Sequence, residues 1–151
     1  MNWSHLHLAL NHLPVLGVPF VVLLLAWGWA FRKREVVRVA VLWMALVSVV
    51  AIAVKFTGDF AVDVDPKRLA EARAYLDRHE ESADQATTAV FLLGLAAAVA
   101  LYLGRGERAL PSWMLAVLVA LGIGTSGLYA RSANLGGQIN HPELRSPGPG
   151  R

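Results

Sequence analysis

The sequence contains no cysteine, and charged residues make up only 17% of its 151 positions. Without cysteine the chain cannot form a disulfide, a thiolate metal site, an iron–sulfur cluster or a covalently attached c-type haem. Any metal or cofactor must therefore be held by histidine, methionine, carboxylates or the backbone. The shortage of charge, with 56% hydrophobic residues and a mean hydropathy of +0.47, excludes an ordinary soluble domain and predicts a membrane protein.

Four apolar runs are long enough to cross a bilayer, which takes about 20 residues of helix. They cover residues 13–31, 36–56, 86–103 and 110–130. Together they leave no room for a separate soluble domain, so we expect a single all-α transmembrane domain, an integral membrane four-helix bundle embedded in lipid.

Basic residues mark the two short connections between spans: Arg32, Lys33, Arg34, Arg38, Arg105 and Arg108. By the positive-inside rule these connections lie on the cytoplasmic side of a bacterial inner membrane. The N-terminus, the connection 58–85 and the C-terminal tail 131–151 then share the periplasmic face. Because the basic residues flank apolar spans, the isoelectric point of 9.7 does not indicate nucleic-acid binding.

The long connection is predicted to be helical. Between Pro66 and Gly94 the chain has no glycine or proline, and Asp65 is a suitable N-cap before a proline in the first turn. Apolar residues recur at spacings of three and four, which predicts an amphipathic periplasmic helix leading into the third span. His79 lies on its apolar stripe.

All the histidines fall at or near the predicted periplasmic face: His5, His7, His12, His79 and His141. Among the first three, His12 lies deepest. Residues 3–10 either continue the first span or form a separate interfacial segment anchored by Trp3.

A short internal repeat relates the two halves of the chain. TGDFA begins at Thr57 and SGLYA begins at Ser126; His12 precedes the first by 45 positions and His79 precedes the second by 47. We interpret this as two pseudo-symmetric helical hairpins, which would bring His12 and His79 to opposite sides of one central space.

Two imidazoles from different helices, in a chain without cysteine, favour a non-covalent b-type haem. We expect His12 and His79 as axial ligands. Two glycines and two cations would line the macrocycle and its propionates respectively: Gly58, Gly127, Lys55 and Arg131. The function expected is electron transfer, as a membrane subunit or partner of a redox or respiratory complex. No nucleophile–base pair indicates an enzyme.

Two other readings use the same residues. A periplasmic copper or zinc site would draw its ligands from His5, His7, His12, His79 and His141. A cofactor-free structural subunit would pack against a larger membrane complex through the small residues at 96–100 and 122–127. Self-association into a homo-oligomer also stays open.

Four motifs carry a resemblance over nearly the whole chain: HLHLALNHLPVLG at 5–17, TGDFA at 57–61, HEESA at 79–83 and ANLGGQINHPE at 133–143. They resemble an uncharacterised bacterial family of small four-helix inner-membrane proteins, classed as a domain of unknown function. The resemblance implies relatives beside or fused to redox proteins, and a role in haem binding. The family's histidines and glycine pair match His5, His7, His12, His79, His141, Gly136 and Gly137.

Overall fold

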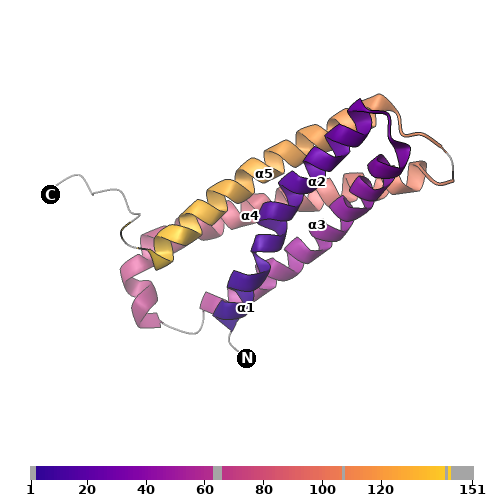
Figure 1. Cartoon of the computed structure of the whole chain (residues 1–151). Helices are drawn as coiled ribbons and strands as arrows, with labels where there is room; N and C mark the ends of the chain where they lie inside the picture. The colour runs from indigo at the N-terminus through magenta and orange to yellow at the C-terminus, as the bar shows by residue number, and fades with distance from the viewer. Residues whose placement is uncertain (1–2, 63–65, 107, 142, 144–151) are drawn as a thin grey trace.

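The computed structural model describes residues 3–62, 66–106, 108–141 and 143 (Figure 1). Its helices are α1 Trp3–Leu10, α2 His12–Ala30, α3 Arg34–Val62, α4 Pro66–Leu103 and α5 Ser112–Asn140. The expected helix over the long connection is confirmed from Pro66 onward, whereas the expected N-cap, Asp65, lies outside the described residues.

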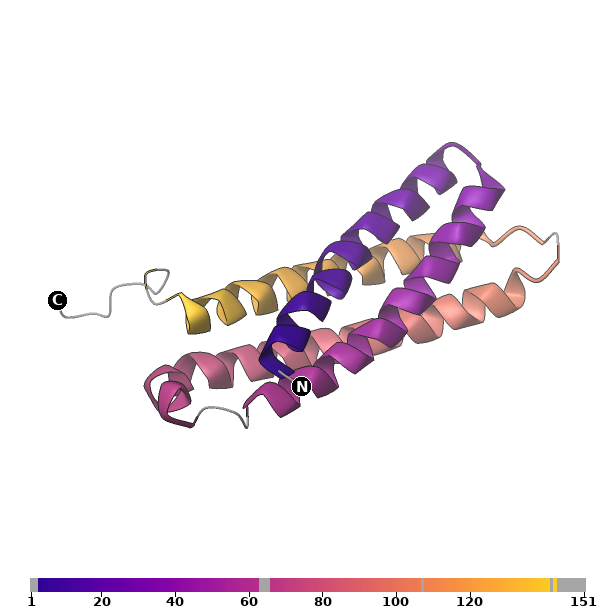
Figure 2. The same cartoon turned by 60° about the horizontal axis from the view of Figure 1, so that its bottom comes forward.

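Helices α2 to α5 form an antiparallel up-and-down bundle, which confirms the predicted all-α four-helix architecture (Figures 1 and 2). Helix α2 packs against α3 and α5, and α4 packs against the same two neighbours. The short α1 packs on α3, with a smaller contact to α2. The start of α1, the end of α3, the start of α4 and the end of α5 lie together at one end of the bundle (Figure 1).

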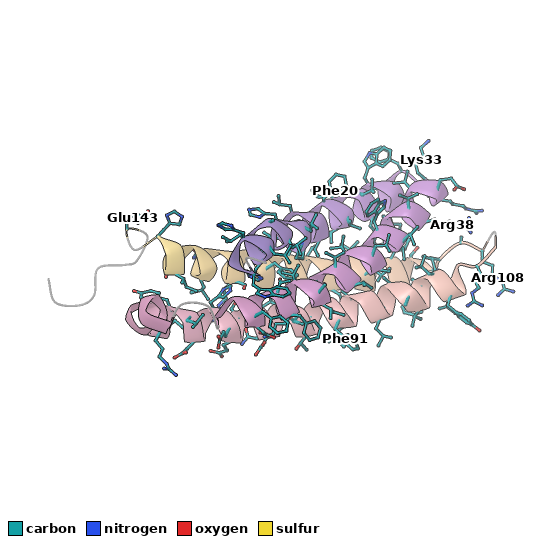
Figure 3. All side chains as sticks on the ribbon, turned by 90° about the horizontal axis from the view of Figure 1, so that it is seen from below. Phe20, Lys33, Arg38, Phe91, Arg108 and Glu143 are labelled. Atoms are coloured by element: carbon teal, nitrogen blue, oxygen red, sulfur yellow. The ribbon has the colours of Figure 1, made fainter. Side chains whose placement is uncertain are left out.

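Four helical stretches are long and apolar enough to cross a membrane: His5–Ala30, Arg34–Phe60, Arg73–Leu103 and Ser112–Ile139. Only 28–33% of the most apolar window of each stretch is buried inside the bundle. The remaining apolar side chains face outward, as Phe20 and Phe91 do (Figure 3). Such a surface would be strongly disfavoured in water, so the protein is a membrane protein whose outer surface contacts lipid.

Small residues bring the helices together. A Cβ at Gly122 of α5 would clash with Val22 of α2, and a Cβ at Gly94 of α4 would lie 2.7 Å from the Cβ of Ser48 on α3. Around these contacts the core is filled by side chains with little or no exposure, such as Leu25, Val41, Leu93 and Leu118. The bundle is therefore closely packed through its centre.

The helix boundaries differ from the expected spans at the end that carries the histidines. Helix α5 continues to Asn140, through ten residues expected to begin the tail, because it packs along the N-terminal part of α4. The first span is preceded by α1, with a break at Asn11. Pro14 explains this break, since it lacks the N–H that would donate to the carbonyl of Leu10.

The other end of the bundle holds the basic turns. Lys33, Arg38 and Arg108 gather there, whereas Glu143 lies at the opposite end (Figure 3). The Arg38 guanidinium donates to the carbonyl oxygen of Gly104 at 3.3 Å and to that of Gly106. Gly106 has a φ of 71°, a conformation that glycine adopts without strain. Arg38 thereby ties α3 to the turn after α4.

Candidate functional site

His7 reaches from α1 onto the last turns of α3. Its Nδ1 lies 3.2 Å from the carbonyl oxygen of Val54 and 3.2 Å from Oγ1 of Thr57. The Thr57 hydroxyl itself donates to the Val54 carbonyl at 2.7 Å. Because a carbonyl oxygen only accepts, Nδ1 of His7 carries the proton and Nε2 is left with a lone pair.

His79 makes the equivalent contact from α4 onto α5. Its Nδ1 lies 3.0 Å from the carbonyl oxygen of Ser132 and 3.5 Å from the Ser132 Oγ. The same reasoning puts the proton on Nδ1 and the lone pair on Nε2. Both rings are half-buried among the helices. An imidazole whose Nδ1–H is held by a backbone carbonyl is the usual arrangement of a histidine that binds metal through Nε2.

His7 is on α1 and His79 is in the first half of α4, and these two elements lie at the same end of the bundle (Figure 1). A positive charge on His79 would act on His7. They come from α1 and α4, which do not pack against each other within the described residues. A ligand between the rings would therefore bridge two elements that the protein leaves apart.

A charged cluster lies beside the rings. Nζ of Lys55 is 2.6 Å from Oδ1 of Asp59 and 3.2 Å from Oδ1 of Asp84, so it joins α3 to α4. The charge of Asp59 acts on His7 and that of Lys55 acts on His79. Across the described chain, no three His, Asp or Glu side chains gather closely enough to hold a metal ion. The site thus offers two imidazoles and no third side-chain ligand of these types.

Buried hydroxyl groups lie within the bundle. Thr57, Thr125 and Ser48 each donate to a carbonyl three or four residues earlier in their own helix. Ser82, one turn after His79, is 1% exposed, and its Oγ has no hydrogen-bond partner among the described residues. A buried hydroxyl without a hydrogen-bond partner lowers the stability of the folded protein by about 1–3 kcal/mol. Ser82 is therefore expected to be destabilising, unlike the three bonded hydroxyls.

The remaining histidines lie outside this pair. His12 is exposed, and its Nδ1 donates to the carbonyl of Leu8 in the preceding turn at 2.8 Å. His5 is also exposed. His141 is exposed beyond α5, with its Nδ1 2.9 Å from Oε1 of Glu143. Of the two histidines that the repeat paired, His79 is therefore held between helices, whereas His12 is exposed.

The other predicted site residues divide between the site and the surface. Gly58 lies against His7, as described below. Gly127 is on the exposed side of α5, where a Cβ would meet no atom within 4 Å. Lys55 is engaged by two carboxylates. The exposed Arg131 lies 3.5 Å from Oε1 of Gln85.

The internal repeat does not indicate which glycine of α5 contacts His79. It matched Gly58 with Gly127, whereas the glycine that contacts a histidine on α5 is Gly136. Helix α5 is longer than the predicted span. Its contact with His79 therefore falls in the segment that was expected to be the tail. The glycine pair at 136–137 is the feature of the sequence that marks this contact.

Scans of family models, of curated proteins and of solved structures each found no match to this chain.

Proposed function

We propose that this protein binds one b-type haem near the end of the bundle that carries the histidines. We further propose that it carries electrons as a membrane subunit or partner of a redox complex. The observation that supports this most directly is that His7 and His79 are each held at Nδ1 by a backbone carbonyl of a neighbouring helix. We propose that these two residues would hold the haem iron through Nε2, so His7 takes the place expected for His12.

The residues present fit the group. Two neutral imidazoles can both offer Nε2 lone pairs, and the two rings are half-buried among the helices. The iron of a bound haem supplies one-electron chemistry. The Val54 and Ser132 carbonyls fix the tautomer and direction of the two rings and increase the basicity of Nε2. Holding both rings in place before and after electron transfer keeps reorganisation small.

The charged residues contribute less than the sequence predicted. Lys55 is already neutralised by Asp59 and Asp84, so any propionate would compete with two carboxylates for it. The exposed Arg131 lies beside the amide oxygen of Gln85, a neutral group, and is the better propionate partner. We propose that the haem end faces the periplasm of a bacterial inner membrane, since the basic turns occupy the other end.

The test is a reduced-minus-oxidised absorption spectrum of the detergent-purified protein, with elemental analysis of the same sample. We expect a sharp Soret shift and split visible bands, which indicate low-spin haem, with iron at one atom per chain. A colourless protein carrying copper or zinc would contradict this and favour the metal-site alternative. A protein carrying neither would favour the structural-subunit alternative.

The ligand assignment has a matched control within the chain. His7→Ala and His79→Ala should each abolish the low-spin spectrum, whereas His12→Ala should preserve it, because His12 has the same Nδ1–carbonyl bond but is exposed. Loss of the spectrum in His12→Ala with retention in His7→Ala would restore the assignment expected from the sequence.

A further inference from the structure

Two glycines lie directly against the two site histidines. A Cβ added to Gly58 on α3 would come within 3.0 Å of Cε1 and 3.2 Å of Nδ1 of His7. A Cβ added to Gly136 on α5 would come within 3.1 Å of Cε1 and 3.3 Å of Nδ1 of His79. These separations are shorter than ordinary van der Waals contact, so a methyl group at either position would require the ring to move by a few tenths of an ångström.

The same local arrangement occurs twice. His7 donates to the carbonyl of Val54, and Gly58 follows that residue by four positions on α3. His79 donates to the carbonyl of Ser132, and Gly136 again follows by four positions, on α5. Residues four apart lie one above the other on the same helix face. Each imidazole therefore contacts a carbonyl acceptor and, one turn further along the same helix, a glycine that has no side chain.

Other glycines of α5 do not share this feature. A Cβ at Gly124, Gly127 or Gly137 would meet no atom within 4 Å. Glycine inside a helix is less favourable than alanine. At Gly58 and Gly136 the glycine also makes a close contact with a histidine ring.

We propose that Gly58 and Gly136 are positioning residues for His7 and His79. The missing Cβ lets each ring approach until its Nδ1–H reaches the carbonyl, and this approach sets where Nε2 points. What Nε2 then binds rests on the function proposed above. The positioning itself is a property of the cofactor-free protein and is tested separately.

The first experiment follows the rings without cofactor. In protein labelled with ¹⁵N-histidine, the Nδ1–H of His7 and that of His79 should be protected from exchange with solvent. Gly58→Ala should remove this protection from His7 and leave His79 unchanged, and Gly136→Ala should do the reverse. The matched controls Gly127→Ala and Gly137→Ala should leave both signals in place. Protection of both rings in every variant would overturn the proposal.

A double-mutant cycle keeps the test decisive if Gly58→Ala folds poorly. Alanine at position 58 should lower the folding equilibrium constant at least tenfold in the wild-type background. In a His7→Ala background the same change should be neutral or stabilising, because the ring it displaces is gone and alanine favours the helix. The same cycle applies to Gly136 and His79. An equal loss in both backgrounds would show that the glycine acts independently of the ring and would refute the proposal.

The second experiment uses haem as the probe. Gly58→Ala and Gly136→Ala should each weaken haem binding at least tenfold or convert the low-spin spectrum to high-spin, whereas the two controls should not. If the wild-type protein binds no haem, the proposed function fails, and the exchange and cycle measurements still decide the positioning role. If both variants bind haem as the wild type does while their rings are displaced, the link between positioning and ligation is refuted.

Discussion

The hydroxyl of Ser48 donates to the carbonyl of Met44 at 2.9 Å in its own helix, whereas Ser82, equally buried, has no partner for Oγ among the described residues. The two serines therefore differ in what alanine would remove. At Ser48 it would remove a hydrogen bond, and at Ser82 it would remove a buried polar atom that has no compensation.

We expect Ser82→Ala to raise the free energy of unfolding of the cofactor-free protein by about 1 kcal/mol, and Ser48→Ala to lower it by a similar amount. Reversible unfolding in mixed micelles, followed by circular dichroism, measures both. An equal destabilisation by the two substitutions would mean that Ser82 is hydrogen-bonded in the folded protein.

The carboxyl group of Glu143 lies outside the membrane spans and gives a pH-dependent prediction. Its pKa is lowered from 4.5, first because the backbone N–H of Glu143 donates to it and second because His141 does. A lowered pKa favours the charged form, so the local turn is stabilised above the ordinary pKa and loses this stabilisation as pH falls through the lowered value.

His141→Ala should raise the pKa of Glu143 toward 4.5 without reaching it, because the backbone contact, the larger cause, remains. A ¹³C NMR titration of the carboxyl carbon measures the change. An unchanged pKa would show that His141 does not hold the carboxylate in solution.

Two glycines of α5 differ in whether they lie at a contact between helices. Gly122 faces Val22 of α2, and Gly124 faces open space. Alanine at 122 should destabilise the protein by about 1–3 kcal/mol, because α2 and α5 must move apart. Alanine at 124 should be neutral or stabilise by up to about 1 kcal/mol through helix propensity.

Thermal unfolding of the two variants in the same detergent tests this contrast. Equal effects at both positions would indicate that α2 and α5 do not approach closely at Gly122. The comparison needs no cofactor, so it examines the bundle independently of the proposed function.

The existence and the type of the elements were predictable from local pattern. Each apolar run is about as long as a bilayer crossing requires, and the helical reading of the connection from Pro66 depended only on spacing and on the absence of glycine and proline. The ends of the helices were not predictable in this way. Polar residues such as Ser132 continue α5 because they pack against α4, a contact that local pattern does not contain.

For the molecule as a whole, the separation of charge between the two ends predicts its orientation. Lys33, just before the second span, and Glu80, in the first part of the third span, are both exposed. They lie toward opposite ends of the bundle. In the naturally cysteine-free background, Glu80→Cys should react with a membrane-impermeant maleimide in whole cells, and Lys33→Cys should react only after the membrane is permeabilised. The opposite pattern of labelling would invert the proposed topology and place the histidine end in the cytoplasm.

The sequence by itself determined the environment and the architecture of this protein. The lack of charge in four long apolar runs leaves helices in lipid as the stable arrangement, since every backbone polar group must be bonded within its own segment. It also determined the class of side chain available to a cofactor, because histidine is present and cysteine is absent.

Only the tertiary structure decided which histidines are held between helices. His12 was expected to lie deeper than His7. The packing of α1 on α3 places His7 against Val54 and Gly58, whereas His12, the first residue of α2, is exposed. The contacts that hold His7 and His79 join residues 47 or more positions apart in the chain, and no local periodicity specifies them.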